Sequence, residues 1–311
     1  MTDFPQLDGF RGAPGVVRLI GHRGARGVMP ENTMEGFVFT LSVGVRALEF
    51  DVVLTKEKTP VITHNHHLLN AATRGRDGNW LTGDELKVSE LSLSEIKQLD
   101  VGGLDGNTVY GKRFPDQAFM SGVRVPRLAE LLDFALQPEG KDLLLLLEMK
   151  SEPAAPDQAQ CSLAIVHEVV NEVRSRGLEQ RTVLHSFDWK ILEECARVAP
   201  EMPRSFLSQL PENADEPGED SQKSVAPDFD ALGMSIPKAV ASAGGRLWCP
   251  YFMDVTADHV SEAHDLGLLV STWTVNETED INAMIDAGVD GIITDYPGRA
   301  QRILLSRGMT W

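Results

Sequence analysis

Apolar, β-prone runs alternate with helical patterns along nearly the whole 311-residue chain. Most of these runs are rich in Val, Ile and Leu without strict alternation, which is typical of strands buried on both faces of a parallel sheet. Eight strand–helix units predict a (β/α)8 TIM-type barrel, and a doubly wound sheet is the structural alternative. The expected strands lie near residues 17–22, 47–53, 142–149, 181–187, 203–209, 246–252, 268–275 and 289–295.

Helical patterns separate these strands, and some carry start signals. Thr33 precedes the first helix and Asp188 precedes the helix that begins "WKIL", and both are residue types that cap helix N-termini. A chain of this length can bury a large core, and α/β barrels of this size form one unit. We therefore expect a single barrel domain over residues 1–311.

Two segments do not fit the repeat. Residues 65–126 are rich in Gly, Asn, Asp and Arg and are too long for an ordinary connection, which predicts a small insertion after the second strand. Residues 210–227 are acidic and Pro-rich, which favours a surface loop.

The charge balance limits the partners of the chain. With 46 acidic and 29 basic side chains its net charge is −17, so we expect neither nucleic-acid binding nor stable membrane association. Cys161, Cys195 and Cys249 are odd in number and widely spaced, which favours reduced thiols. Because no signal peptide and no apolar run of about 20 residues is visible, a cytoplasmic location is expected. The oligomeric state stays open, a homo-oligomer included.

Carboxylates lie at the ends of the expected strands, where barrel active sites form. Glu49 and Asp51 are two residues apart in "ALEFDVVL" and therefore face the same side of one strand. Buried carboxylates are unfavourable without a neutralising cation. Together with Glu148, which follows "LLLLL", they predict a hard oxygen site for one Mg²⁺ or Ca²⁺ ion. The alternative is a structural cluster that is ion-paired with Arg46 or Lys150.

Two histidines are expected to meet at the same place. His22 ends the first strand, and a hairpin before "TPVITH" would bring His64 alongside Asp51. Imidazoles titrate near neutral pH and suit general acid and base catalysis. His66 and His67 follow directly, and we interpret them as solvated loop histidines rather than zinc ligands.

Other strand-end side chains suit an anionic substrate. Arg23 and Lys150 are the nearest cations, and an arginine can hold a phosphate through two parallel hydrogen bonds. A tryptophan such as Trp273 in "STWTVN" is more often a core residue, but its position at the end of a barrel strand makes it a candidate for the floor of a substrate pocket.

This combination resembles the glycerophosphodiester phosphodiesterase family. The resemblance covers about residues 18–305, and HRG alone would be a weak signal, whereas the segments together are specific. It implies a TIM-type barrel, one divalent cation, and hydrolysis of a glycerophosphodiester to sn-glycerol 3-phosphate and an alcohol such as choline or ethanolamine. The matching segments, in the family's order, are "GHRGARGVMPENT", "ALEFDVVLTKEKTPVITH", "LLLLLEMK", "LHSFDWKIL", "VSTWTVN" and "GVDGIITDYP".

The resemblance also implies a role for each motif position. It implies that the insertion caps the site and determines which alcohol group is accepted. The implied roles are acid/base catalysis by His22 and His64, metal ligation by Glu49, Asp51 and Glu148, phosphate binding by Arg23 and Lys150, orientation of these groups by Glu31 and Asn32 of PENT, and contact with the glycerol by Trp273.

Two features depart from the family pattern. The turn "TKEKTP" lacks the family's usual Asp-Gly, a change that we expect to be neutral. Asn65 follows His64 where the family usually has Asp, and this change would leave His64 less basic. Two other functions fit the same barrel: a sphingomyelinase D-like or lysophospholipase D-like activity, and a catalytically dead barrel used for binding. The PENT motif and the lack of a basic amphipathic face count against the first, and the filled catalytic positions count against the second.

Overall fold

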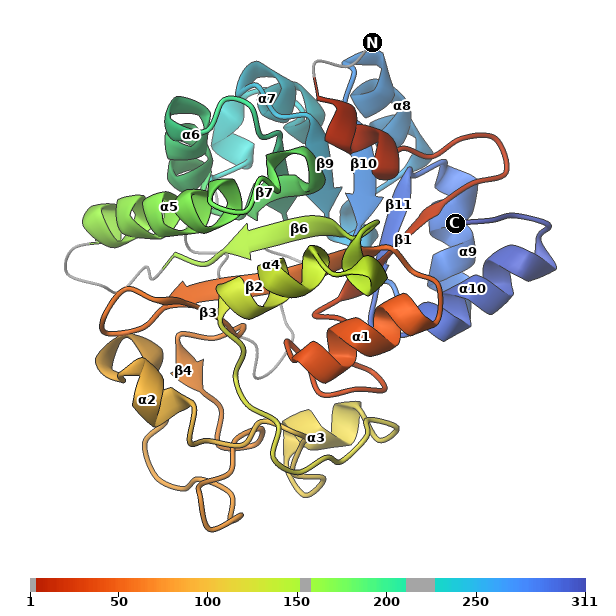
Figure 1. Ribbon diagram of the computed structural model, residues 1–311. Coiled ribbons are helices and arrows are strands. Elements are labelled where there is room, and N and C mark those ends of the chain that lie inside the picture. The colour runs from red at the N-terminus through yellow and green to blue at the C-terminus, as the bar shows by residue number, and fades with distance from the viewer. Residues whose placement is uncertain (1–3, 152–157, 211–226) are drawn as a thin grey trace.

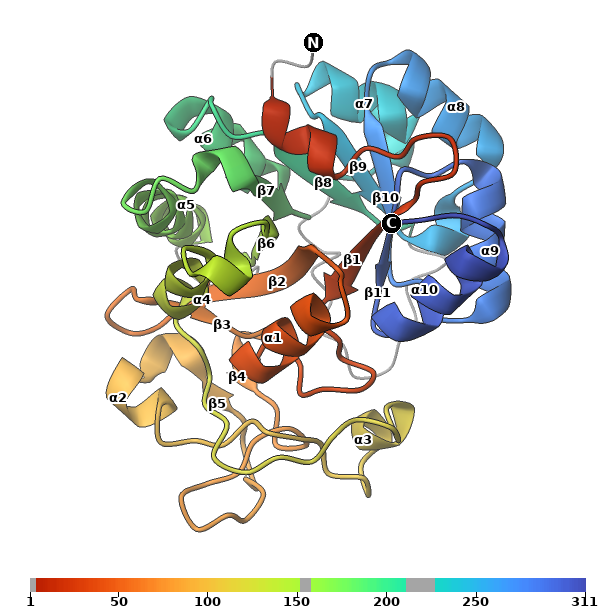
Figure 2. The ribbon, with the colours of Figure 1, turned by 45° about the vertical axis from the view of Figure 1, so that its right-hand side comes forward.

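The computed structural model is a closed barrel of eight parallel strands surrounded by helices (Figures 1 and 2). It describes residues 4–151, 158–210 and 227–311, so nearly all of the expected loop at 210–227 lies outside the described residues. The first barrel strand pairs with both the second and the last, which closes the sheet. The barrel is therefore confirmed, and the doubly wound alternative is excluded.

All eight barrel strands lie where the sequence predicts them, with ends that differ by a few residues. Each is almost wholly buried, as expected for strands covered on both faces. In barrel order they are β1 (Arg18–His22), β2 (Ala47–Leu54), β6 (Leu144–Met149), β7 (Thr182–Ser186), β8 (Arg204–Ser208), β9 (Leu247–Pro250), β10 (Leu269–Thr272) and β11 (Gly291–Thr294).

Helices cover the outside of the barrel. Thr33 and Asp188 cap α1 and α6 as predicted, because their side chains accept hydrogen bonds from the backbone N–H groups of Gly36 and Lys190. The seven-residue helix α7 was not predicted, since it is too short to show a helical period. The helices are α1 (Met34–Ser42), α4 (Leu128–Ala135), α5 (Gln158–Arg174), α6 (Trp189–Val198), α7 (Ile236–Ser242), α8 (Ala257–Asp265), α9 (Thr278–Ala287) and α10 (Pro297–Ser306).

Apolar side chains fill the barrel interior. An N-terminal segment closes the end of the barrel at which the strands begin. The 3-10 helix η1 (Pro5–Gly9) places Leu7 among the buried interior residues, and Phe10 follows it there. The Gln6 side chain donates hydrogen bonds of 3.3 and 3.1 Å to the backbone carbonyl oxygens of Glu179 and Glu201. Each such buried Leu or Phe contributes about 1.5–3 kcal/mol. The other interior residues are Ile20, Ala47, Leu146, Val183, Phe187, Leu207, Leu247, Cys249, Leu269 and Ile293.

Leu269 of β10 and the free thiol of Cys249 on β9 both belong to this interior cluster. Cys195 is also a buried free thiol, which fits the predicted reduced cysteines, whereas the side chain of Cys161 lies outside the described residues. Within the described part of the chain, no helix is both long enough and apolar enough to cross a membrane.

The insertion begins after a hairpin formed by β2 and β3 (Pro60–Ile62), which pair antiparallel. It contains β4 (His67–Leu68), β5 (Leu86–Lys87), α2 (Leu93–Ile96) and α3 (Val109–Arg113), and it extends from the barrel beyond β3 and α1 (Figures 1 and 2). A small apolar cluster joins it to the hairpin. That cluster consists of Val53, Val61, Leu68, Val88, Ile96 and Val125.

Candidate active site

The register of neighbouring strands brings the polar strand-end residues together at one end of the barrel. His22 of β1 lies opposite Glu49 of β2, and Asp51 of β2 lies opposite Glu148 of β6. Glu148 in turn lies opposite His185 of β7. Because parallel strands present their C-terminal ends on the same side, these side chains form one layer at the mouth of the barrel.

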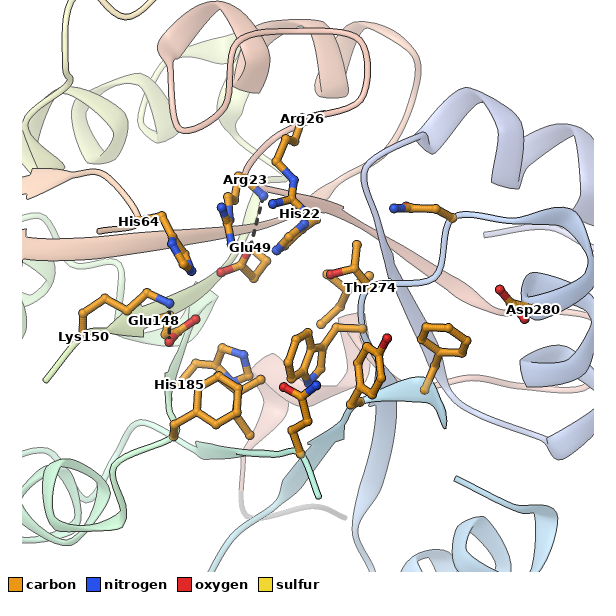
Figure 3. A pocket seen from close by; sticks show the side chains of 18 of the residues that line it. His22, Arg23, Arg26, Glu49, His64, Glu148, Lys150, His185, Thr274 and Asp280 are labelled. Atoms are coloured by element: carbon orange, nitrogen blue, oxygen red, sulfur yellow. Dashed lines mark hydrogen bonds and ion pairs between the residues drawn. The ribbon is translucent and has the colours of Figure 1, made fainter. Parts of the chain in front are cut away.

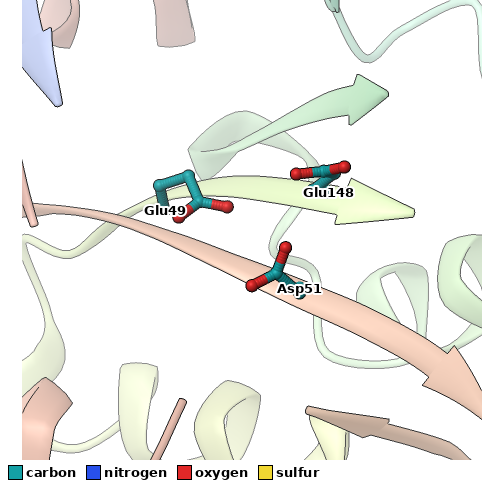
Figure 4. A group of neighbouring side chains, drawn as sticks. All are labelled: Glu49, Asp51 and Glu148. Carbon is teal, nitrogen blue, oxygen red and sulfur yellow. The ribbon is translucent and has the colours of Figure 1, made fainter. Parts of the chain in front are cut away.

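The three carboxylates predicted as metal ligands converge within this layer (Figure 4). Glu49, Asp51 and Glu148 are buried, and each offers one oxygen atom within 4.8 Å of the others. Lys150 Nζ lies 2.8 Å from Asp51 Oδ1 and 2.7 Å from Glu148 Oε1. Lys150 is therefore the cationic partner of two of these carboxylates.

The negative charge of the three carboxylates is only partly neutralised by Lys150. Burial raises the pKa of Glu49 well above its usual value, and the charges of Asp51 and Glu148 raise it further. Burial likewise raises the pKa of Glu148 to about 7, although Lys150 opposes the shift. Three carboxylate oxygens are hard donors, so the triad could hold a divalent cation that would favour the ionised forms.

A cavity of about 270 Å³ opens at this end of the barrel (Figure 3). The carboxylate of Glu49 lies between the rings of His22 and His64 in this view. Asp51 is buried and only 1% exposed, and Glu31 and Asn32 line a smaller cavity that also includes His64. The predicted residues that line the larger cavity are His22, Arg23, Glu49, His64, Glu148, Lys150 and Trp273.

The PENT motif returns to the mouth and contacts both a carboxylate and an arginine. Asn32 Nδ2 donates a hydrogen bond of 2.8 Å to Asp51 Oδ2, and Glu31 Oε1 accepts one of 3.0 Å from Arg23 Nη1. The segment that leads from β1 to the PENT motif contains residues with left-handed backbone, with φ of +48° at Arg23, +86° at Gly24 and +54° at Asn32. A Cβ at Gly24 would also meet neighbouring backbone at 3.0 Å, so glycine fits both requirements.

His64 reaches the site from the hairpin. The backbone N–H of Thr63 donates a hydrogen bond of 3.1 Å to the carbonyl oxygen of Asp51, which fixes the end of the hairpin beside β2. His64 Nδ1 lies 2.5 Å from Asn65 Oδ1. Since an amide oxygen can only accept, this contact orients the imidazole with a proton on Nδ1 and adds no charge.

The two following histidines lie apart from the carboxylate triad. His66 Nε2 is 3.0 Å from the carbonyl oxygen of Ser151, and His67 belongs to β4 with an exposed side chain. Among the described residues, the triad is the only cluster with the composition and spacing of a metal site.

Sequence reasoning gave no role to three side chains that lie at the site. Asp295 Oδ1 is 2.7 Å from His22 Nδ1 and accepts a hydrogen bond of 2.9 Å from Arg26 Nε. His185 lines the cavity, and its Nδ1 is 2.8 Å from Ser205 Oγ. Burial and the charge of Lys150 lower the pKa of His185 to about 3, so this imidazole is neutral. Both Asp295 and His185 stand at strand ends, which is the signal that could have found them.

The fold and the chemistry at its mouth place the protein among the TIM-barrel phosphoric diester hydrolases. More narrowly, the chain belongs to the Glycerophosphoryl diester phosphodiesterase family, whose sequence model matches residues 22–299. The family predicted from the motifs is therefore confirmed.

Solved structures and curated relatives agree with this assignment. A protein of Silicibacter pomeroyi DSS-3, provisionally named a glycerophosphoryl diester phosphodiesterase, is 59% identical with a TM-score of 0.92, and 99% of each chain is covered. The glycerophosphodiester phosphodiesterase of Caldanaerobacter subterraneus subsp. tengcongensis is 28% identical, over 90% of this chain and 94% of the relative. An Oleispira antarctica phosphodiesterase solved with the product sn-glycerol-3-phosphate shares the fold, with 19% identity, a TM-score of 0.68, and 93% and 97% coverage.

Proposed function

We propose that the protein hydrolyses glycerophosphodiesters, such as glycerophosphocholine or glycerophosphoethanolamine, to sn-glycerol 3-phosphate and the free alcohol, with Mg²⁺ or Ca²⁺ as cofactor. Family membership supports the reaction class. The observation that carries the proposal is the placement of His22 and His64 on two sides of the Glu49 carboxylate, each imidazole oriented through its Nδ1 atom.

In this proposal the cations of the site hold the phosphodiester. Glu31 fixes the Arg23 guanidinium, and two carboxylates fix Lys150, so both groups are preorganised for anionic oxygens. A divalent cation held by Glu49, Asp51 and Glu148 would offset the negative charge that develops on the phosphoryl oxygens.

The two histidines move the protons. His22 accepts the proton of the nucleophile at Nε2 while the new O–P bond forms, and His64 donates a proton to the alcohol oxygen while the old P–O bond breaks. The nucleophile is either water or the glycerol hydroxyl of the substrate. Attack by the hydroxyl gives a cyclic phosphate first, and product analysis after a single turnover would distinguish the two routes.

The remaining features concern substrate selection and location. We propose that the insertion at 65–126 belongs to the same single domain as the barrel and limits the size of the alcohol group, since Arg113 of α3 lines the cavity. Trp273, fixed by a hydrogen bond of 2.9 Å to the Cys249 carbonyl, would contact the glycerol. The net charge of −17 supports action without stable association with anionic membranes. We propose a cytoplasmic location.

The test is a panel of substrates with and without EDTA, with release of glycerol 3-phosphate as the readout. We expect EDTA to abolish hydrolysis of glycerophosphocholine and added Mg²⁺ or Ca²⁺ to restore it, with EDTA pre-saturated by Mg²⁺ as the control. Full activity in the chelator would contradict the metal assignment. Faster hydrolysis of lysophosphatidylcholine would favour the lysophospholipase D-like alternative, and binding without turnover would favour a dead barrel.

A further inference from the structure

Asp295, at the C-terminal end of β11, is a fully buried carboxylate that contacts His22 directly. Its Oδ1 lies 2.7 Å from His22 Nδ1 and 2.9 Å from Arg26 Nε. Its Oδ2 accepts hydrogen bonds of 3.1 Å from Arg26 Nη2 and 2.7 Å from Asn276 Nδ2. The side chain has 0% exposure.

The orientation of the Asn276 amide follows from its other contacts. Asn276 Oδ1 accepts hydrogen bonds from the backbone N–H of Asp295 at 2.9 Å and from Thr294 Oγ1 at 3.2 Å. A backbone N–H can only donate, so the amide oxygen must face it and Nδ2 must face the Asp295 carboxylate. The guanidinium group of Arg26 has no acceptor atom, so Arg26 also donates its hydrogen bonds to Asp295.

The chemical state of Asp295 follows from these donors. Burial alone would raise the pKa of Asp295, but the charge of Arg26 and the hydrogen bonds from His22 and Arg26 hold it well below its usual value. An ionised carboxylate can only accept, and its contact with His22 therefore requires a proton on Nδ1. Nε2 is on the other side of the ring, 3.8 Å from Glu49 Oε2.

We propose that Asp295 is a positioning residue for His22, which it holds as the Nδ1–H tautomer so that Nε2 is the basic atom presented to the carboxylate layer. The catalytic consequence rests on the proposed function, whereas the tautomer does not. Asp295 also stabilises the imidazolium that forms when His22 accepts a proton, as the carboxylate of a Ser-His-Asp triad does for its histidine.

Residues of the insertion contact Arg26, which donates hydrogen bonds to Asp295. The Arg26 guanidinium carbon lies 4.6 Å from the centre of the Phe114 ring, and Gln117 Nε2 donates a hydrogen bond of 2.7 Å to the Arg26 carbonyl oxygen. Arg26 is only 3% exposed. The insertion thus contacts the arginine that in turn holds Asp295.

The first test needs no variant. In protein labelled with ¹⁵N-histidine, the nitrogen shifts of His22, assigned by comparison with His22→Gln, should show the proton on Nδ1 in the neutral form. A neutral His22 with its proton on Nε2 would overturn the proposal. The tautomer of His22 is measured independently of whether the protein hydrolyses glycerophosphodiesters. Failure of the proposed function would show instead as a lack of glycerol 3-phosphate release by the wild type.

The second test is Asp295→Asn. Every neighbour of the carboxylate is a donor, and among them only His22 can become an acceptor, by moving its proton from Nδ1 to Nε2. We therefore expect the new amide NH₂ to face His22, which reverses the tautomer. We expect kcat to fall on the order of 10³-fold, with KM unchanged within about threefold because the phosphate-holding groups are untouched. An unchanged kcat, or a loss confined to KM, would contradict the proposal. If this variant does not fold, the nitrogen shifts of the wild type still decide.

Asp290→Asn is the matched control. Asp290 precedes β11 at the opposite end of the barrel, where its Oδ2 lies 2.8 Å from His264 Nε2 and accepts a hydrogen bond from the Val270 N–H. The Asp290→Asn variant therefore removes the same negative charge from a similar Asp–His pair. Its kcat should stay within about twofold of the wild type. An equal loss of kcat in both variants would assign the Asp295 effect to general damage of the fold.

Discussion

The two histidines of the site have contrasting surroundings. His22 lies on a barrel strand, and its Nδ1 contacts the ionised carboxylate of Asp295. His64 lies on the β2–β3 hairpin, and its Nδ1 contacts the neutral amide of Asn65. Both partners orient a ring, but only the carboxylate also stabilises a positive charge on it.

This contrast matches the two proposed roles. A general base becomes positively charged as it works, so a carboxylate beside His22 assists proton uptake. A general acid starts positively charged, and a carboxylate beside His64 would hold its proton more tightly. Asn65 therefore suits an acid. The comparison teaches that orientation and charge can be supplied separately at the two ends of one reaction.

The largest expected effect is that of His22→Ala. Loss of the base should lower kcat on the order of 10³-fold, and by the same factor for glycerophosphocholine and for a glycerophosphodiester of 4-nitrophenol, because nucleophile activation is needed for both. Steady-state kinetics with the two substrates measure this. His264→Ala, at the opposite end of the barrel, serves as control, and wild-type turnover in His22→Ala would remove His22 from the mechanism.

His64→Ala should have a smaller effect that depends on the leaving group. With choline as the leaving group we expect a loss of about 10²-fold. With 4-nitrophenol the loss should be less than about tenfold, since this anion departs without a proton. Equal losses with the two substrates would refute the role of His64 as acid and would remove the contrast with His22.

Asn65→Asp gives His64 the same kind of partner as His22. The added negative charge favours the protonated imidazole, so the pKa of His64 should rise and the alkaline limb of the kcat profile should move to higher pH. At neutral pH, kcat should change by less than about tenfold. Asn107→Asp, an exposed site in the insertion, adds the same charge away from His64. A profile that does not move in Asn65→Asp would show that this partner does not set the titration.

The smallest effect is expected for Tyr110→Phe. The Tyr110 hydroxyl donates a hydrogen bond to Glu31, which in turn holds Arg23. Without it, KM for the phosphodiester should rise about three- to tenfold, whereas kcat should change little because neither histidine is touched. Val109→Ala on the same helix is the control, because Val109 is 71% exposed. A fall in kcat with constant KM would mean that the insertion acts on the histidines instead.

Much of the fold could be predicted because the signal is repeated. Apolar runs at regular spacing identified all the barrel strands, and barrel closure then gathers their C-terminal ends without further information. The closing helix η1 and the short elements of the insertion escaped prediction, because segments of two to five residues show no period.

Within the site, the side chains that we propose to act on substrate were easier to find than those that support them. His22 and Glu49 stand out because ionisable residues within or directly after a buried apolar run are unfavourable without a partner. The partnership of Asp295 with His22 joins residues 273 positions apart, and only barrel closure brings them together. Arg26 lay within a recognised motif, but nothing in the sequence shows that it faces Asp295 and Phe114.

The closed end of the barrel has a consequence for how a substrate is captured. In the part of the chain that the structure describes, Leu7 and Phe10 close that end, and the cavity opens at the other. Walls of low polarizability bend electric field lines toward the aqueous opening, so the charge of a divalent cation held by the carboxylate triad would add to the charges of Arg23 and Lys150 along the barrel axis. With that cation bound, an anion would be steered into the mouth of a chain whose total charge is −17, and its capture rate should fall as added salt shortens the reach of the field.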